Sequence, residues 1–509
     1  MGAVLMVQGC ASSVGKSLIV TGLCRLYARR GISVAPFKAQ NLALNSFVTR
    51  DGHEIGRAQV VQAEAAGIEP TVDMNPILLK PESDAGAQVV LMGKPVRKSD
   101  TRSYFERRDE VSALVQASLE RLRTRYDLVL IEGAGSPAEI NLRDRDIANM
   151  HVARMAGAPV LLVGDIDRGG VFAHLVGTLE LLEPEERAHV AGLLINKFRG
   201  DRSLVESGIE LLEERTGLPM LGLLPYLANL RIADEDSVSL DGRASRPSAG
   251  AHELDIAVLR FPYLSNHDDF LPLEREPGVV LRFVESVAEL GQPDLLILPG
   301  TKNTRGDLAW LRDTGLEAEV QARAKLGHKL LGICGGYQML GRSIEDPLGV
   351  EGEPGSVSGL GLLPVTTRFG DEKTTKQVSL KWAARTNSIL SGDPGEAEAI
   401  TGFEIHMGEV AIEDGAATLF VRSGGQSPEG VVAGSVAGTL VHGLFENDAL
   451  RRDLLDRLRE LRALESAPAS EVKSSLAEYD RLADALEANL DLPRMDTILE
   501  RSWPRAASL

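Results

Sequence analysis

Cysteine is scarce in this sequence, because Cys10, Cys24 and Cys334 are the only three in 509 residues. So few thiols in so long a chain exclude a disulfide-stabilised scaffold and favour a reducing compartment. No apolar run approaches the roughly 18 residues that a membrane-spanning helix needs, so we expect no membrane association. The N-terminus has no basic region before its first apolar run, unlike a signal peptide. These absences together predict a cytoplasmic protein.

Basic residues are also in deficit. The chain has 55 Lys and Arg against 73 Asp and Glu, which gives a formal net charge of −18. Such acidity argues against a nucleic-acid-binding surface, although a local basic site for phosphates is compatible with it. With 43% hydrophobic and 25% charged residues, the composition is typical of a globular protein and excludes collagen-like and disordered classes. The length predicts two to four domains.

Short apolar runs alternate with helical patterns in the first half of the chain. Each run is apolar on both faces, as expected for a strand buried in a parallel sheet. The runs are residues 3–9, 32–37, 127–133, 158–165, 190–197 and 220–225, and helical patterns include 17–30 and 110–123. We therefore predict a doubly wound α/β domain over residues 1–240, with ligands at the C-terminal ends of its strands.

A second series of runs follows a stretch rich in Gly, Ser, Ala and Pro at 241–251, which we interpret as a linker. Its expected strands are 254–261, 279–284, 294–299, 329–333 and 359–365, followed by a β-rich stretch at 402–442. These predict a second α/β domain over 252–450. Helical patterns at 450–464 and 475–490 predict a helical C-terminal extension over 451–509.

A glycine-rich loop follows the first predicted strand and opens the first long helix. This context is the one that a phosphate-binding P-loop requires, although five residues separate the two glycines instead of the usual four. Small residues let backbone N–H groups surround phosphate oxygens, Lys16 would reach the outer phosphates, and the Ser17 hydroxyl would bind Mg²⁺. The expected ATP-binding residues in this loop are Gly9, Ser12, Ser13, Gly15, Lys16 and Ser17. The alternative is a glycine-rich turn that carries Gly-Lys-Ser by chance.

Polar residues end two other strands of the first domain. Glu132 closes the run 127–131, where a carboxylate can complete a Mg²⁺ shell together with Ser17. Asn196 ends another run, where its amide can bind a nucleotide base. The alternatives are a helix-capping or solvated acid for Glu132 and a solvated loop residue for Asn196.

The sharpest motif is Gly332-Ile-Cys334-Gly-Gly336, between an apolar strand and a helical pattern. It is a nucleophile elbow with Cys in place of Ser, and it places the sulfur at a helix N-terminus. The backbone N–H of Gly335 can face an oxyanion, and Gly300, in another strand-end loop, offers a second donor. His442 ends a strand and is the candidate base. The alternatives are a buried structural thiol and one of nine histidines placed there by chance.

A nucleotide site and a cysteine nucleophile in one chain suggest coupled chemistry. Phosphorylation of a carboxylate gives an acyl phosphate that an amine can attack, whereas free ammonia is mostly protonated at neutral pH. A Cys–His site that hydrolyses glutamine through a thioester would supply ammonia. The two sites therefore indicate an ATP-dependent amidoligase with a glutaminase half.

The residues also carry a family resemblance. Residues 331–341 with His442 resemble a class I glutamine amidotransferase domain, and the P-loop resembles those of dethiobiotin synthetase and of cobyrinic and cobyric acid synthases. The chain is similar to the cobyric acid synthase family from the first strand to residue 484. Besides the two motifs, the stretches that carry this similarity are 37–46, 73–81, 165–172, 196–200 and 479–484.

The resemblance implies a P-loop NTPase-like sheet followed by a flavodoxin-like amidotransferase sheet. It implies amidation of the b, d, e and g propionates of cobyrinic acid a,c-diamide, with ATP, Mg²⁺ and L-glutamine, and it allows a homo-oligomer. By the same resemblance Cys334 is the nucleophile and His442 its base. Lys38 would lie beside the γ-phosphate, with Gln40 on the same loop, and Asp146 near the corrinoid carboxylate.

One position departs from the family pattern. Many class I amidotransferases carry Glu two residues after the histidine, but position 444 is leucine and Glu446 is the nearest acid. Either another carboxylate orients His442 or the site works as a Cys–His dyad, so the third member of the triad is left open. Two rival functions also stay open: a cobyrinic acid a,c-diamide synthase, and a ParA-like ATPase regulator with an inactive amidotransferase domain.

Overall fold

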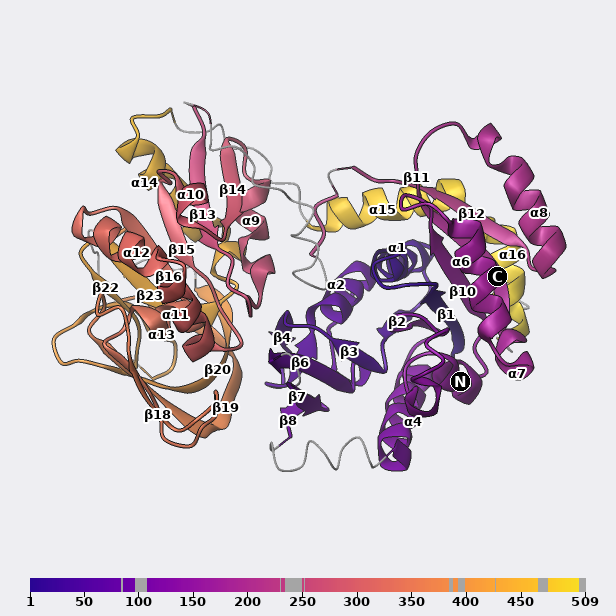
Figure 1. Cartoon of the computed structure of the whole chain (residues 1–509), viewed down its shortest axis with the longest axis horizontal. Coiled ribbons are helices and arrows are strands. Elements are labelled where there is room, and N and C mark those ends of the chain that lie inside the picture. Colours follow the sequence, from indigo (N-terminus) through magenta and orange to yellow (C-terminus); the bar gives the residue numbers. More distant parts are fainter. Residues whose placement is uncertain are drawn as a thin grey trace.

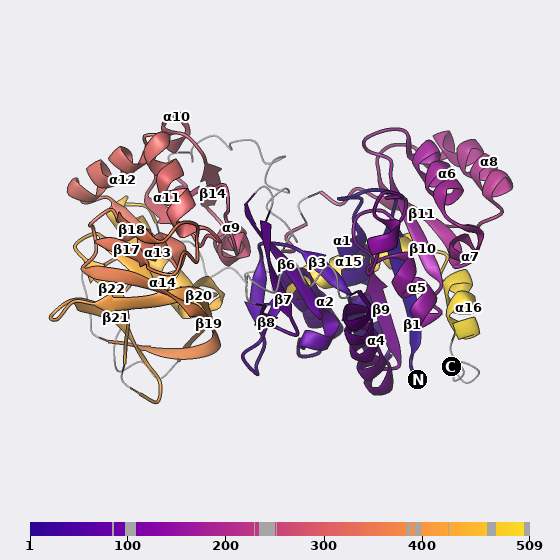
Figure 2. The same ribbon diagram turned by 60° about the horizontal axis from the view of Figure 1, so that its bottom comes forward.

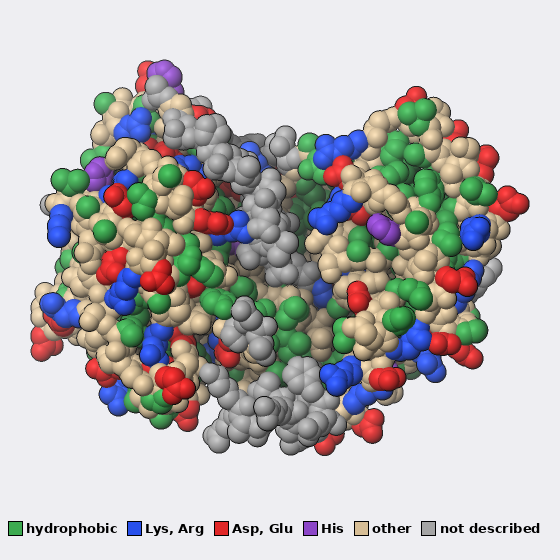
Figure 3. All heavy atoms as spheres, in the orientation of Figure 1, with side chains coloured by type: hydrophobic (Ala, Val, Ile, Leu, Met, Phe, Trp, Pro, Cys, Tyr) green, Lys and Arg blue, Asp and Glu red, His purple; other side chains and the backbone are tan. Residues whose placement is uncertain are grey.

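The computed structural model has two lobes, each built on its own sheet (Figures 1 and 2). It describes residues 1–83, 86–96, 108–228, 230–233, 250, 252–383, 388–391, 399–425, 427–465 and 475–502. The predicted linker 241–251 lies outside the described residues except for Gly250. On the face seen in Figure 3, basic and acidic side chains are interspersed over both lobes. No described helix is long and apolar enough to cross a membrane.

The N-terminal lobe is organised by a parallel sheet, which forms because helices connect its successive apolar strands. Strand β1 is central, with Met6 in register with Val160 and Val4 with Val129. In spatial order the described strands are β12 (Met220–Pro225), β11 (Val190–Phe198), β10 (Val160–Asp165), β1 (Ala3–Gly9), β9 (Leu128–Glu132) and β2 (Val34–Phe37). Each predicted run of this half therefore contains a strand.

Helices cover both faces of this sheet (Figure 1). One apolar core lies under α4, α5, α6 and α8, and a second lies under α1, whereas α2 contributes to both. The helices of this lobe are α1 (Lys16–Arg29), α2 (Arg57–Ala66), α4 (Arg108–Arg125), α5 (Met150–Ala156), α6 (Val171–Leu181), α7 (Pro184–Arg187) and α8 (Glu206–Thr216), with 3-10 turns η1 (Val72–Met74), η3 (Arg143–Arg145) and η4 (Arg202–Leu204).

Two small sheets extend this lobe toward the other one (Figure 1). The first has the order β3-β6-β7-β8, and the second is the hairpin β4–β5. Their bounds are β3 (Gln40–Leu42), β6 (Ile77–Ser83), β7 (Gly86–Leu91), β8 (Lys94–Pro95), β4 (Ser46–Val48) and β5 (Glu54–Gly56).

The second lobe contains a mixed sheet that is parallel through β14-β13-β15-β16-β23. Beyond β23 the described strands pair antiparallel, except that β17 and β19 are parallel. Its strands are β13 (Leu254–Leu259), β14 (Val279–Val284), β15 (Leu295–Leu298), β16 (Lys329–Ile333), β17 (Ser343–Asp346), β18 (Gly355–Ser358), β19 (Val365–Trp382), β20 (Ile400–Ile412), β21 (Ala417–Arg422), β22 (Pro428–Ala433), β23 (Val436–Thr439) and β24 (Val441–His442). Two α/β lobes with parallel sheets confirm the predicted fold class.

Helices and 3-10 turns connect these strands: η6 (His267–Phe270), α9 (Leu271–Arg275), α10 (Val287–Leu290), α11 (Thr304–Asp313), α12 (Leu316–Lys325), α13 (Gly335–Leu340), η7 (Leu444–Glu446) and α14 (Asp448–Leu461). The strand predicted at 359–365 is wrong, because this segment is a loop up to Val365. Its apolar residues are explained by packing: Leu360 and Leu363 are buried, and the backbone N–H of Leu360 bonds the Met339 carbonyl.

The two lobes are joined by the long hairpin β19–β20 and a buried charge cluster. Thr375 Oγ1 donates to the Gly52 carbonyl over 2.8 Å, which ties β19 to the N-terminal lobe. Glu54 is fully buried between Lys80 at 2.9 Å and Lys373, from β19, at 2.6 Å. Burial opposes ionisation of Glu54, but the two lysines outweigh it and hold its pKa well below the usual range.

The helices near the C-terminus divide between the two lobes. Helix α14 packs on the second sheet, whereas α15 (Ser475–Asn489) and α16 (Leu492–Ser502) return to the first and close its core beside α1 (Figure 1). Leu486 reaches the backbone of α1, where a Cβ placed on Gly22 would lie 2.4 Å from its Cδ1. The expected extension over 451–509 therefore does not pack as one unit in its described part.

We predict that Leu486→Ala destabilises the N-terminal lobe by about 3 kcal/mol, because it leaves a cavity between α15 and α1. Leu486 is only 3% exposed, whereas Leu476 on the same helix is 45% exposed. Leu476→Ala is therefore the control, and it should change the free energy of unfolding little. Urea unfolding followed by circular dichroism measures both. Equal, small effects would show that α15 does not seal this core.

Candidate active site

Cys334 occupies a strained turn between β16 and α13, as the elbow motif predicts. Its backbone has φ 51° and ψ −110°, a conformation that residues with a Cβ rarely adopt. The neighbouring glycine is required by close packing, since a Cβ on Gly336 would lie 2.0 Å from the Leu298 carbonyl oxygen. The turn places the sulfur at the wall of a pocket and at the N-terminus of α13.

The imidazole of His442 lies between the cysteine and a carboxylate. His442 Nδ1 is 2.6 Å from Asp269 Oδ2, and the backbone N–H of Gly443 donates to Asp269 Oδ1 over 3.0 Å. His442 also hydrogen-bonds the Cys334 side chain. The structure therefore brings together Cys, His and Asp, with Asp269 in the place of the third member.

Sequence reasoning missed Asp269 and considered Glu446 instead, because it searched downstream of the histidine. Asp269 lies in η6, which follows β13, and is 173 residues away along the chain. Glu446 is exposed on η7. The only available signal was the acidic pair at 268–269 after the first strand of the second domain.

Opposing effects set the charge of His442. Burial disfavours its cationic form, but the carboxylate of Asp269 and the Cys334 side chain outweigh burial and raise the pKa of His442 to about 10. The imidazole is therefore cationic at neutral pH, where it can hold a negative charge on sulfur.

The two glycines expected at the oxyanion position lie beside these groups. A Cβ on Gly300 would be 2.9 Å from His442 Cε1, and one on Gly335 would be 2.6 Å from Thr301 Cγ2. The backbone near Cys334 is thus open only because neither residue carries a side chain.

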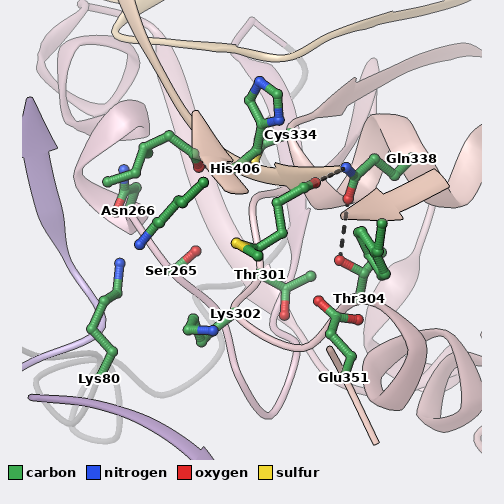
Figure 4. Close-up of a pocket in the computed structure, with 14 residues that line it drawn as sticks. Lys80, Ser265, Asn266, Thr301, Lys302, Thr304, Cys334, Gln338, Glu351 and His406 are labelled. Carbon is green, nitrogen blue, oxygen red and sulfur yellow. Dashed lines mark hydrogen bonds between the residues drawn. The ribbon is translucent and has the colours of Figure 1, made fainter. Parts of the chain in front are cut away.

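A pocket opens from Cys334 toward the other lobe (Figure 4). Gln338 accepts from Thr304 Oγ1 over 3.2 Å and donates to the Met407 carbonyl over 3.1 Å, so its amide is fixed along the wall. Lys80, on β6 of the N-terminal lobe, faces this pocket from the side opposite Cys334 (Figure 4). The charged residues that line it are Lys80, Lys302, Glu351 and Lys373. The N-terminal lobe thus forms part of the wall.

The glycine-rich loop has the geometry of a phosphate-binding loop. Ser13 and Gly15 both have positive φ, 59° and 102°, so the backbone curls after β1. A Cβ on Gly9 would lie 3.2 Å from Lys16 Nζ. In this structure Lys16 donates to the carbonyls of Ala11 and Gly135, at 3.1 and 2.8 Å, across the loop.

Glu132 is the centre of a buried cluster at the foot of that loop. Its Oε1 accepts from Ser17 Oγ at 2.8 Å and from Lys38 Nζ at 2.9 Å, and its Oε2 accepts from Gln62 Nε2 at 2.6 Å. Burial opposes ionisation, but Lys38 and these hydrogen bonds lower the pKa of Glu132. An ionised carboxylate and a hydroxyl 2.8 Å apart fit Mg²⁺, which takes oxygen ligands and shares its shell with phosphates.

The remaining predicted residues have structural contacts. Asn196 Nδ2 donates to the Val14 carbonyl over 2.8 Å and so touches the phosphate loop. Asp146 accepts from three backbone N–H groups, those of Ala148, Asn149 and His151, and caps the start of α5. Gln40 begins β3 and is half-buried. Ser12 is exposed on the phosphate loop.

The fold and the two sites define a glutamine amidotransferase joined to a P-loop nucleotide-binding domain. Residues 255–450 match the family model of the CobB/CobQ-like glutamine amidotransferase domain, and residues 5–240 match that of the CobQ/CobB/MinD/ParA nucleotide binding domain. The chain belongs to the cobyric acid synthase family, whose members are glutamine-dependent amidating ligases.

Three relatives support this assignment, each named cobyric acid synthase. The protein of Sorangium cellulosum is 58% identical and covers 97% of this chain and 98% of its own. The protein of Desulforudis audaxviator is 52% identical, and the match covers 97% of this chain and 99% of the relative. The protein of Dehalococcoides mccartyi strain CBDB1 is 48% identical, and the match covers 98% of this chain and 99% of the relative. The P-loop domain in such a ligase supports ATP as the nucleotide.

We predict that Asp269→Asn lowers the glutaminase kcat by a hundredfold or more, roughly, because an amide neither orients His442 nor stabilises its charge. The pKa of His442 should fall from about 10 toward its usual value, so less of the imidazole is cationic at pH 8 and alkylation of Cys334 by iodoacetamide slows. Peptide mass spectrometry separates Cys334 from Cys10 and Cys24.

The matched control is Glu446→Gln, which removes an exposed carboxylate of η7. It should leave both the glutaminase rate and the alkylation rate within about twofold. If Glu446→Gln and Asp269→Asn were equally harmful, Asp269 would not be the third member of the triad.

Proposed function

We propose that this chain converts cobyrinic acid a,c-diamide, with or without an adenosyl ligand on cobalt, into cobyric acid by amidating the b, d, e and g propionates. Each amidation consumes one ATP and one glutamine. The observation that carries the proposal is the Cys334–His442–Asp269 arrangement at a pocket whose far wall belongs to the P-loop lobe.

In the glutaminase half, the Cys334 sulfur attacks the carboxamide carbon of glutamine. Backbone N–H groups at Gly300 and Gly335 stabilise the oxyanion. His442 gives its proton to the departing nitrogen, which leaves as ammonia, and the remaining thioester is hydrolysed to glutamate with His442 as base. The zwitterionic end of glutamine suits a pocket that offers three lysines and Glu351.

In the synthetase half, a corrinoid carboxylate attacks the γ-phosphorus of ATP. ADP leaves, and ammonia then displaces phosphate from the acyl phosphate to give the amide. Lys16 and Lys38 neutralise charge on the phosphates, and Gly9, Ser12, Ser13 and Gly15 shape the loop around them. Ser17 and Glu132 would hold Mg²⁺, which when bound supplies charge neutralisation at the phosphates.

Three further residues have supporting roles in this proposal. Asn196 donates to the Val14 carbonyl of the phosphate loop, and from there it would contact the nucleotide. Gln40 and Asp146 would contact the corrinoid. Asp146 also accepts from the backbone N–H groups of residues 148, 149 and 151 and so fixes that segment.

We predict that Cys334→Ala abolishes glutamine-dependent amidation and leaves ammonia-dependent amidation within about threefold of the parent. The sulfur is the only group lost, and the ATP site is built from other residues. Rates with glutamine and with ammonium chloride measure the two. Equal loss with both nitrogen donors would contradict a separate glutaminase site.

We further predict that mass spectrometry of the corrinoid, incubated with ATP, Mg²⁺ and glutamine, shows four successive carboxylate-to-amide steps. Cobyrinic acid and its a,c-diamide are compared as substrates. Amidation of only the undecorated acid would favour the a,c-diamide synthase. ATP turnover without any dependence on glutamine would favour a ParA-like regulator.

A further inference from the structure

Asp269, the carboxylate that contacts His442, lies in a turn that the N-terminal (P-loop) lobe contacts directly. Residues 266–269 are consecutive, and the first three contact the other lobe. Asn266 Oδ1 accepts from the backbone N–H of Ser46 over 3.1 Å, and His267 Nδ1 is 2.9 Å from Asn45 Nδ2. Asp268 Oδ2 is 2.7 Å from Arg57 Nε. The next residue is Asp269, which holds His442.

A second contact reaches the same histidine from its other side. The ring of Phe403 stacks on the imidazole of His442, with centroids 5.3 Å apart and planes at 18°. Phe47, on β4 of the P-loop lobe, packs edge-on against Phe403 with centroids 4.9 Å apart. The guanidinium of Arg57 lies 5.5 Å from the Phe47 ring centroid. Arg57 therefore contacts Asp268, which precedes Asp269 in the chain, and Phe47, which packs on Phe403.

Arg57 is the first residue of α2, and the same helix reaches the nucleotide site. Gln62, five residues on, donates to Glu132 Oε2, the carboxylate expected to hold Mg²⁺. A rigid helix sets the two contacts about 7.5 Å apart along its axis. Glu132 Oε1 accepts from Lys38 and its Oε2 from Gln62 of α2. If Mg²⁺ is held by Ser17 and Glu132, it would take one of these carboxylate oxygens, and the contact between Glu132 and α2 would then change.

We propose that Arg57 is a positioning residue through which the P-loop lobe aligns the Asp269–His442 pair and makes glutamine hydrolysis depend on the nucleotide site. This inference rests on the proposed glutaminase function. Arg57 touches neither glutamine nor nucleotide: it fixes Asp268, and Asp268 fixes the backbone from which the Asp269 carboxylate projects. The positive charge of Arg57 is itself held by Glu64 at 3.4 Å, which also accepts from Tyr479 of α15.

The test compares Arg57→Met with the parent in the full chain. Glutamate release is measured without nucleotide, and again with ATP, Mg²⁺ and the corrinoid. We expect the glutaminase kcat to fall about tenfold or more, since small misalignments of catalytic groups are costly, with the KM for glutamine changed less than about threefold. ATP with Mg²⁺ and corrinoid should change glutamate release by the parent, and this response should be lost in the variant.

Two variants separate positioning from general damage. Arg57→Lys keeps a cation near Asp268 and should recover part of the kcat. Thr375→Val removes the contact between β19 and Gly52, an interlobe hydrogen bond away from η6, and should leave kcat within about twofold. Ammonia-dependent amidation by Arg57→Met, kept within about twofold, shows that the chain is folded and its ATP site intact.

Three outcomes would overturn the proposal: an unchanged kcat in Arg57→Met, equal losses in Arg57→Met and Thr375→Val, or a parent whose glutamate release ignores nucleotide and corrinoid. Cys334→Ala is run in the same series. If it retains glutaminase activity, the proposed function itself is wrong. If it is inactive while Arg57→Met behaves as the parent, only the role of Arg57 is wrong.

Discussion

The ion pair between the buried carboxylate of Asp269 and the imidazole of His442 is the interaction on which the arrangement of groups around Cys334 depends. A carboxylate away from water is costly unless it has a cation and hydrogen bonds, and Asp269 has both, from His442 Nδ1 and from the backbone N–H of Gly443. The same pair keeps His442 cationic beside a sulfur that needs a positive neighbour. The Asp269–His442 pair therefore both stabilises the η6 turn and supplies the positive charge beside the Cys334 sulfur.

A similar constraint joins the lobes. Glu54 is fully buried, and its charge is balanced by one lysine from its own lobe and one from β19 of the other. Separation of the lobes would break the ion pair between Glu54 and Lys373. Loss of one partner of a buried ion pair costs free energy, so this pair favours the joined arrangement. Because Lys80 and Lys373 also line the pocket beside Cys334, the interface between the lobes forms part of the pocket wall.

Local patterns in the sequence predicted the parts of the structure that form within a few consecutive residues. The strands of both parallel sheets, the phosphate loop and the cysteine elbow follow from short motifs, since each is built by backbone geometry within a few residues. Asp269 could not be found in this way, because its meeting with His442 depends on how β13 and β24 are placed in the sheet. The strand predicted at 359–365 was wrong for a related reason: this loop is buried against α13, and its buried apolar residues give the same pattern as a strand. Residue roles at the corrinoid side stay predictions, and Asp146 has a capping contact that explains its place without a ligand.

The last described helices return to the first sheet, so both ends of the described chain belong to the N-terminal lobe. Helix α16 packs beside β1, so the amidotransferase lobe is inserted between two parts of the synthetase lobe instead of being appended to its end. The second lobe is joined to the first by two chain connections, one before β13 and one after α14. Two connections restrict its rotation relative to the first lobe more than one connection would. A cut in either connection alone would therefore leave the two resulting fragments associated noncovalently, held by the contacts of α15 and α16 with α1 and β1.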